Sequence, residues 1–291
     1  MLGQIFNVIA PVFICAVVGY VWRRQGRAYD TNFVTTLVTS VGTPCLVFDT
    51  LIRTRIEPDA FLTMGLASVL SMAIFYPVYS LYLRAIGWSQ RAFLGALTYG
   101  NVGNMGLPLC LLAFGEHGLA LAIAYFTVNV LFLFTCGVAV SAGAGSPGQL
   151  LKLPILYAVT LAMLFIFGGI EAPAWLTNTT KILGGLTVPL MLITLGVSLA
   201  GLNVTGFRVA TAISLMRLGV GFAAGIGLAE LLGLEGAERG VLILQCAMPV
   251  AVFNFLFAQR YNQQPERVAG SVVISTIISF ATLPFLLAFV M

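Results

Sequence analysis

The sequence predicts an all-α polytopic membrane protein with ten transmembrane helices, arranged as two inverted five-helix repeats whose fourth and ninth helices are broken and cross. Three observations lead to this fold class. Of the 291 residues, 59% are hydrophobic and only 8% are charged, a balance that soluble domains do not have. The apolar residues form ten segments, each near the roughly 20 residues that a helix needs to cross a bilayer. Two of these segments contain helix-breaking residues at matching places in the two halves of the chain.

The order of the spans and the distribution of positive charge predict the topology. Nine Lys and Arg residues lie in the connections after odd-numbered spans and four in those after even-numbered spans. Because positively charged loops remain in the cytoplasm, we predict a plasma-membrane protein with both termini outside. No connection is long enough for a soluble domain. The predicted spans are 5–22, 31–52, 60–83, 92–114, 117–140, 150–170, 181–201, 208–232, 240–258 and 267–290.

The fourth span contains an unusual segment, residues 100–108, with three Gly, one Pro and two Asn. Gly weakens a helix, and Pro108 lacks the N–H that the carbonyl of Asn104 would accept. We therefore predict that the backbone unwinds between Asn101 and Pro108, with Gly106 and Pro108 as helix-breaking residues. At membrane depth, unwound backbone is found where protein buries it or where it lines a wet cavity.

The two halves of the chain repeat this pattern. Pro44 in the second span and Pro189 in the seventh lie 145 positions apart, and a shift of 148 places Asn101 opposite Pro249 in the ninth span. We predict one repeat at 1–140, a cytoplasmic linker at 141–149 and a second repeat at 150–291. An odd number of spans in each half forces opposite orientations, which is typical of secondary transporters with a central site.

The predicted breaks have a chemistry suited to anions. A helix N-terminus carries about half a positive charge, and amide side chains add hydrogen-bond donors without a buried charge. The alternative for each Asn and Gln is that it only satisfies the unwound backbone. The predicted substrate-binding residues are Gly100, Asn101, Gly103, Asn104, Gln245, Met248, Pro249, Asn254 and Arg217, and Pro249 is also the predicted helix-breaking residue of the ninth span.

Two charged residues inside the spans allow more than one interpretation. Arg217 lies about nine residues into the eighth span. It either provides a counter-charge for an anionic substrate or a gating ion pair, or it binds carbonyls of a broken helix. Asp49 is interpreted as an exposed partner of Arg53 at i+4, with a proton-coupling carboxylate as the alternative.

The sequence contains no HExxH, GxSxG or Walker motif, a single histidine (His117) and five scattered cysteines. We therefore expect no catalytic residues, no metal and no cofactor, and the small net charge of +4 makes nucleic acid a poor partner. Three classes compete: a secondary active or facilitative carrier of small organic anions, an anion channel and an intramembrane enzyme. A channel needs a continuous polar pore and an enzyme needs catalytic residues, so the carrier is favoured. A coupling proton or simple facilitated transport is slightly favoured over coupling to sodium, because no compact set of acidic residues with sodium-site chemistry is visible.

The two break motifs resemble those of the auxin efflux carrier family, which includes the plant PIN auxin exporters and bacterial carriers of dicarboxylates such as malonate and malate. They read GNVGNMGLPL, where the family Asn falls on Asn101 and the final Pro on Pro108, and AMPVAVFNFLFAQRYN, which begins its match at Pro249. Gly100, where PIN proteins have Pro, and the short linker are more similar to bacterial members. The resemblance implies a scaffold of spans 1, 2, 6 and 7, a mobile transport domain of spans 3–5 and 8–10, elevator-type alternating access and a homodimer.

Overall fold

Helices form all the named elements of the protein. The computed structural model describes residues 2–54, 56–143, 153–202 and 204–291. Three short π-helices (η1–η3) interrupt the first half of the chain. The elements of the first half are α1 (Leu2–Arg24), α2 (Thr31–Leu37), η1 (Val38–Gly42), α3 (Thr43–Thr54), α4 (Pro58–Ala85), α5 (Gln90–Thr98), η2 (Val102–Gly106), α6 (Leu107–Phe132), η3 (Leu133–Gly137) and α7 (Val138–Ala142). Those of the second half are α8 (Pro154–Phe167), α9 (Ala174–Gly185), α10 (Thr187–Gly201), α11 (Phe207–Leu231), α12 (Gly236–Cys246), α13 (Val252–Arg260) and α14 (Pro265–Val290).

Local sequence signals explain where several of these helices begin and end. The carboxylate of Asp30 accepts a hydrogen bond from the N–H of Phe33 at 3.0 Å and caps α2. Ser89 caps α5 in the same way through the N–H of Ala92, as expected for Ser and Asp at an N-cap. Gly143, with φ 76°, ends α7 in the left-handed conformation that a helix C-terminus often needs.

The all-α membrane class is confirmed, whereas the number of spans is only partly reproduced. In the described residues, seven helices are long and apolar enough to cross a membrane. One of them runs for 41 residues from Val102 to Ala142, about twice the length of a single crossing. At Gly115 this run turns, with φ 67° and ψ −161°. The other predicted spans are represented by short helices, namely α8, with 14 residues, and the pair α12 and α13, with 11 and 9 residues.

The predicted boundaries of the two repeats stay predictions. Helix α7 ends at Ala142, two residues beyond the predicted end of the first repeat at 140. Most of the predicted linker, 141–149, lies outside the described residues. Ten crossings and an inverted repeat therefore remain predictions.

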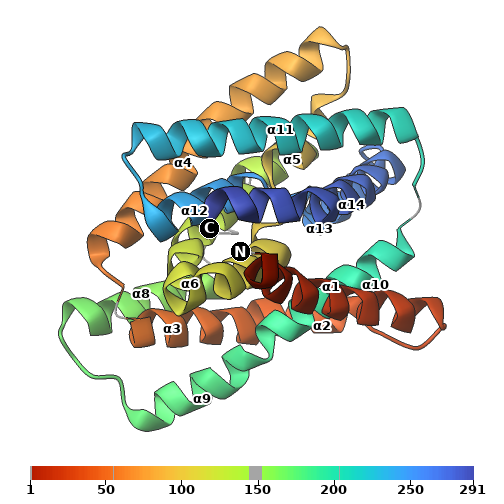
Figure 1. Ribbon diagram of the computed structural model, residues 1–291. Coiled ribbons are helices and arrows are strands. Elements are labelled where there is room, and N and C mark those ends of the chain that lie inside the picture. The colour runs from red at the N-terminus through yellow and green to blue at the C-terminus, as the bar shows by residue number, and fades with distance from the viewer. Residues whose placement is uncertain (1, 55, 144–152, 203) are drawn as a thin grey trace.

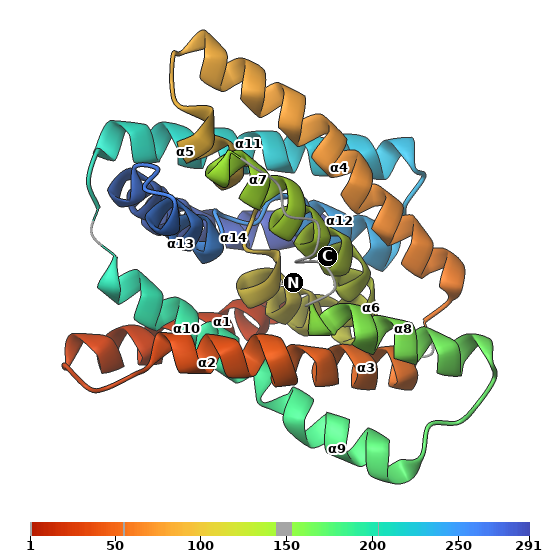
Figure 2. The same ribbon diagram turned by 180° about the vertical axis from the view of Figure 1, so that it is seen from behind.

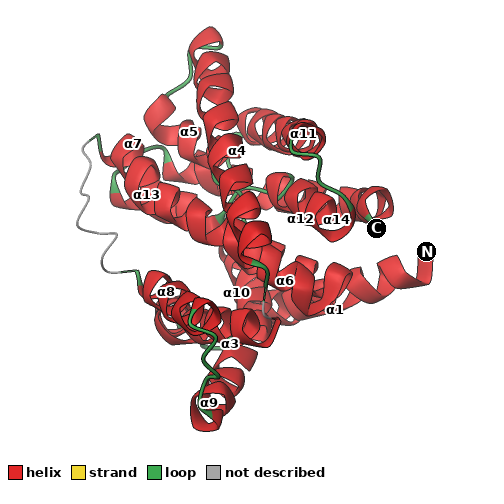
Figure 3. Ribbon diagram, turned by 90° about the vertical axis from the view of Figure 1, so that its left-hand side faces the viewer, coloured by secondary structure: helices red, strands yellow, loops and turns green. Residues whose placement is uncertain are grey.

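The helices pack in two layers, which Figures 1 and 3 show one above the other. The first, here called the α3 layer, consists of α1, α2, α3, α8, α9 and α10. The second, here called the α6 layer, consists of α4, α5, α6, α7 and α11–α14. Within the α3 layer, α1 packs against α10 and α3 against α8 and α9, and within the α6 layer α4 packs against α6 and α11 against α14. The layers meet mainly where α6 and η2 contact α1, α3 and α10.

Both of the predicted mid-span prolines lie directly after an irregular turn within a longer helix of the α3 layer, Thr31–Thr54 or Ala174–Gly201. Pro44 is the second residue of α3, directly after η1, and Pro189 is the third residue of α10, after the junction with α9. Figure 2 shows α2 and α3 following one another along the edge of this layer. A proline removes one helical hydrogen bond, and such positions are where helices carry π-turns and kinks.

Candidate functional site

The two interruptions of the α6 layer cross each other, as the sequence predicted. The first lies between α5 and η2, and the second between α12 and α13. The N–H of Asn101 donates to the carbonyl of Pro249 at 2.7 Å, and the N–H of Ala251 donates to the carbonyl of Tyr99 at 3.1 Å. Together they form an isolated antiparallel bridge between Gly100 and Val250. Each break thus satisfies part of the backbone that the other leaves unpaired.

The first break is shorter than predicted and lies further upstream. Non-helical backbone is confined to the residues between Thr98 and Val102, and the chain re-enters a helix as η2 at Val102. The prediction that Gly106 and Pro108 break the helix is wrong. Gly106 closes η2, and Pro108 is the second residue of α6. The irregularity is absorbed by the π-turn η2, which directly precedes Pro108, so the helical run Val102–Ala142 continues through the proline.

Arg217 of α11 forms hydrogen bonds with the backbone of both breaks at the crossing. Its side chain is 1% exposed. Its Nε donates to the carbonyl of Met248 at 3.1 Å, and its Nη1 donates to the carbonyls of Leu97 and Thr98 at 3.1 and 3.2 Å. These are the unpaired carbonyls at the ends of α12 and α5, where the helix dipoles are negative. Among the described residues no carboxylate forms an ion pair with Arg217.

The close approach of Arg217 explains why residue 100 is Gly. A Cβ atom built on Gly100 would lie 2.2 Å from Nη2 of Arg217 and 3.0 Å from the carbonyl oxygen of Met248. The guanidinium also lies 5.0 Å from the centre of the Phe75 ring. The arrangement thus supports the second of the two interpretations of Arg217, a bond to the carbonyls of the broken helices.

The amides near the second break also face the protein interior. Nδ2 of Asn254 donates to the carbonyls of Tyr99 and Ala251 at 2.9 and 3.1 Å. Gln245 is fully buried, and neither atom of its amide has a hydrogen-bond partner among the described residues. Its Oε1 lies against Gly106, only 2.3 Å from where a Cβ atom would be. Asn254 therefore satisfies unwound backbone, as the alternative interpretation proposed.

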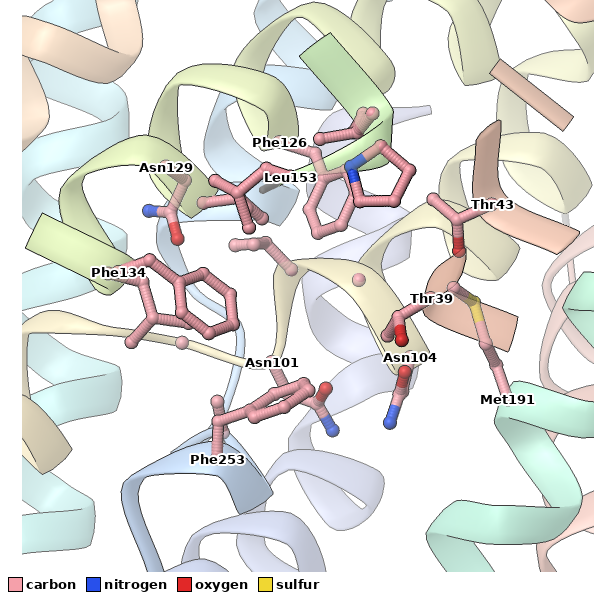
Figure 4. Close-up of a pocket in the computed structure, with 18 of the residues that line it drawn as sticks. Thr39, Thr43, Asn101, Asn104, Phe126, Asn129, Phe134, Leu153, Met191 and Phe253 are labelled. Carbon is pink, nitrogen blue, oxygen red and sulfur yellow. The ribbon is translucent and has the colours of Figure 1, made fainter. Parts of the chain in front are cut away.

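A cavity of about 240 Å³ lies on the other side of the crossing, between the two layers. Figure 4 shows Asn101, Asn104 and Asn129 around it, with the rings of Phe126, Phe134 and Phe253. No Lys, Arg, His, Asp or Glu lines it within the described part of the chain. The lining residues are Thr39, Ser40, Thr43, Gly100, Asn101, Val102, Gly103, Asn104, Phe126, Asn129, Val130, Leu133, Phe134, Leu153, Pro154, Ile155, Met191, Ala251 and Phe253.

All three π-helices of the described residues contribute to this cavity. Thr39 and Ser40 belong to η1, Val102 and Asn104 to η2, and Phe134 to η3. A π-turn widens a helix locally and often occurs at functional sites. The convergence of three such turns on one cavity marks it as the candidate site independently of its chemistry.

The cavity meets the positive end of a helix. Val102, Gly103 and Asn104 supply the first-turn N–H groups of η2, which have no acceptor within a helix. None of them donates to another element in the described ranges. The Nδ2 donor of Asn101 is buried beside them and has no acceptor. Unpaired donors at a helix N-terminus form an anion-binding arrangement.

Of the nine predicted binding residues, the structure places four on the cavity wall: Gly100, Asn101, Gly103 and Asn104. The other five, Gln245, Met248, Pro249, Asn254 and Arg217, are absent from the wall. Sequence reasoning missed Thr39, Thr43 and the aromatic wall. The polar pair Thr39-Ser40 in an apolar span could have indicated that this part of the span lines a site. The π-turns and the aromatic residues of the cavity wall have no recognisable pattern in the sequence.

A second, larger cavity of about 440 Å³ shares Asn104 and Phe253 with the first. It lies where α1, α2, α10 and α13 meet, is lined by several hydroxyl groups, and has Arg23 as its only charged residue within the described chain. Beside it, the hydroxyl of Tyr29 shares a 2.7 Å hydrogen bond with Thr194. Burial raises the pKa of Tyr29, and the bond to Thr194 lowers it by less, so this phenol stays neutral at physiological pH.

Asp49 forms the predicted pair with Arg53, but the prediction that it is exposed is wrong. The Nη2 atom of Arg53 lies 2.8 Å from Oδ2 of Asp49, and the Asp49 residue is only 4% exposed. The same guanidinium reaches Glu116, beside the turn at Gly115, at 3.4 Å. This contact joins α3 to α6 and therefore links the two layers.

Comparisons with known proteins agree with this arrangement. The model of the membrane transport protein family matches residues 4–150 and 146–287. A protein of Methanothermobacter thermautotrophicus named "Uncharacterized transporter" is 27% identical, over 95% of each chain. A Rhizobium meliloti protein named "Putative malonate transporter" is 26% identical, over 98% of this chain and 96% of its own. Because the family model covers nearly the whole sequence, the chain belongs to the membrane transport protein family, the auxin efflux carrier family that the two break motifs resemble.

Proposed function

We propose that this protein is a secondary active or facilitative carrier of small organic anions, mono- or dicarboxylates, which bind in the cavity beside the crossing. One observation carries the proposal: the cavity wall includes Asn101, whose Nδ2 donor is buried without a partner, beside the unpaired N–H groups of η2. A carboxylate oxygen accepts hydrogen bonds from such donors. Since no cationic side chain lines the cavity within the described residues, the site can also empty without leaving an unpaired charge.

Arg217 acts in this proposal as a positioning residue. It binds the negative ends of α5 and α12 from behind, so the carbonyls of those helices do not face the cavity. The positive end of η2 then dominates the potential inside the cavity, because the surrounding protein screens it weakly. A bound anion would be stabilised by the helix terminus and by Asn101, with Asn104 and Asn129 as further amide partners.

The second cavity supports a route to the site from one side of the membrane. It is lined by Arg23, at the end of α1, and shares the lining residues Asn104 and Phe253 with the first cavity. The excess of Lys and Arg after odd spans predicts that this side is cytoplasmic. On the opposite side, Arg53 of the α3 layer contacts Glu116 of the α6 layer. This asymmetry is the one expected of an alternating-access carrier open to the cytoplasm.

The topology belongs to the same proposal. Dividing the 41-residue run at Gly115, and adding α8 and the α12–α13 pair to the other six candidate spans, gives ten crossings and two five-span repeats. The α3 layer would then be the scaffold and the α6 layer the mobile transport domain of an elevator mechanism. A homodimer through the scaffold, coupling to a proton and location in the plasma membrane complete the proposal.

Counterflow in proteoliposomes tests the function. Vesicles containing the purified protein are preloaded with unlabelled malonate, acetate or glucose and then given a trace of the labelled form of the same compound at pH 6 and pH 7.5. A carrier of organic anions accumulates labelled malonate or acetate transiently in matched vesicles, and labelled glucose stays outside. Ohmic single-channel currents in a planar bilayer, or equal counterflow of glucose, would contradict the proposal. Faster uptake of the labelled anion under an imposed pH gradient would support proton coupling.

The proposed binding site also predicts which side chain contributes most to transport of the anion. Asn101→Ala should reduce counterflow of the accepted anion, whereas Asn178→Ala, which removes an exposed asparagine on α9 remote from the cavity, should leave it unchanged.

A further inference from the structure

An apolar groove on the outer face of the α6 layer has no role in the proposed transport site. It has a volume of about 470 Å³ and lies between α11 and α14. Its walls include Leu215 and Phe222 of α11, and Ile278 and Phe285 of α14. Because α11 and α14 both qualify as membrane-spanning helices, hydrocarbon chains rather than water surround this groove.

The length of the groove matches one leaflet of a bilayer. Its residues on α14 extend from Ile278 to Phe289, and at about 1.5 Å per residue this stretch is roughly 16 Å long. Half of a hydrocarbon core is about 15 Å thick. The groove therefore has room for an acyl chain along most of one leaflet.

A cation lies at one end of the groove. The guanidinium of Arg239, in the first turns of α12, stacks 4.9 Å from the centre of the Phe289 ring. Phe289 lines the groove near the C-terminus of α14, where a helix leaves the hydrocarbon region. Within the described residues Arg239 forms no ion pair. Its charge is therefore available to an anionic group at the level of lipid headgroups.

We infer that this groove binds one glycerophospholipid, with an acyl chain between α11 and α14 and the phosphate on Arg239. An apolar slot that ends at a cation complements a phosphate attached to a hydrocarbon tail. The floor of the groove includes Ala247, which directly precedes the crossing residues Met248 and Pro249. The bound chain thus packs against the back of the crossing, on the side opposite the substrate cavity.

Native mass spectrometry of the delipidated full chain tests this inference. The probes are dioleoyl phosphatidylethanolamine, dioleoyl phosphatidylglycerol and dioleoylglycerol, which has the same chains but no phosphate. We expect the protein to retain one copy of either phospholipid about fivefold more than dioleoylglycerol, the effect of one Arg on a lipid headgroup. Arg239→Gln should reduce phospholipid retention to the level of dioleoylglycerol, and Arg208→Gln, on exposed α11 surface, should not.

A second variant tests whether the groove binds the acyl chain, and it leaves Arg239 unchanged. Gly219 lines the groove and has open space where a Cβ atom would be, so Gly219→Leu fills the groove without a backbone clash. Gly227 on the same helix has the same open space but lies outside the groove, so Gly227→Leu is the matched control. Gly219→Leu should abolish retention of all three lipids and Gly227→Leu should preserve it. Equal retention of phospholipid and dioleoylglycerol by the unmodified protein, or undiminished retention in Arg239→Gln or Gly219→Leu, overturns the inference.

Discussion

The two breaks of the α6 layer pair with each other, yet their amide side chains face opposite ways. At the first break, Asn101 and Asn104 line the cavity, and the Nδ2 donor of Asn101 has no partner. At the second, Asn254 is bonded to two backbone carbonyls and Gln245 is packed against Gly106, away from the cavity. Amide side chains at corresponding breaks thus have different tasks. The first break is suited to binding an anion and the second to holding the crossing in place.

Electrostatics gives this difference a physical basis. Where two helices end and two begin, the negative ends must be compensated as well as the positive ones. Arg217 compensates the ends of α5 and α12 within the protein. The start of η2 has no equivalent internal partner in the described residues. In the proposed function, an anionic substrate supplies this missing partner.

The largest expected effect is on folding, from Arg217→Met. The variant leaves three buried carbonyls unpaired, those of Leu97, Thr98 and Met248, and unpaired buried groups cost about 1–3 kcal/mol each. The free energy of unfolding should therefore fall by roughly 3 kcal/mol or more. Thermal unfolding of the purified variant in detergent, followed by intrinsic fluorescence, measures this loss.

The control is Arg208→Met on the exposed surface of the same helix, which should unfold like the unmodified protein. If Arg217→Met unfolded normally but required far more anion for half-maximal counterflow, Arg217 would be a counter-charge for the substrate, and the second break would belong to the binding site.

The next largest effect is on transport, from Asn101→Ala. A hydrogen bond to a charged group contributes roughly 1.5–3 kcal/mol, so transport efficiency for the anion should fall by about ten- to a hundredfold. Unfolding in the absence of substrate should change little, because the Nδ2 donor of Asn101 has no partner in the protein. Wild-type counterflow by a folded variant would remove Asn101 from the site.

The sequence alone predicts those features of the site that depend on local conformational preferences. Three glycines, a proline and two asparagines within residues 100–108 were sufficient to predict an interruption and its polar character, since these preferences are local. Their local nature also explains the error in its position. Whether Pro108 interrupts a helix or lies within one depends on the geometry of the preceding turn, and the π-turn η2 allows the helix to continue through Pro108.

The direction in which a side chain points was beyond sequence reasoning. Asn101 and Asn254 have the same chemistry and lie at paired breaks, but only tertiary packing places one on a cavity wall and the other on the carbonyl of Tyr99. Similarly, the burial of Asp49 depends on neighbours far away in the chain. Hydropathy predicted the membrane class, but it contains no information on side-chain direction or on the burial of a single polar residue.

A smaller effect is expected from Asn254→Ala, again on stability. The change removes two hydrogen bonds, to the carbonyls of Tyr99 and Ala251. Because the carbonyl of Tyr99 keeps its bond from the N–H of Ala251, the loss should be about 1–2 kcal/mol. Thermal unfolding checks this value, with Asn178→Ala as control. The anion concentration for half-maximal counterflow should not change, and a large increase would show that the second break contacts substrate.

The smallest expected effect, and the sharpest test of the comparison, comes from Gln245→Met. The amide of Gln245 is fully buried with no partner for either atom, and burying an unpaired amide costs free energy. Methionine has a similar length and no strong polar group, so the unfolding temperature should stay the same or rise, by an amount equivalent to roughly 1 kcal/mol. Counterflow should be retained, and thermal unfolding and transport are both measured on the same preparation. A well-folded Gln245→Met protein without transport would mean that this amide finds its partner only during the transport cycle. Both breaks would then bind the anion, and the assignment of substrate binding to the first break alone would be wrong.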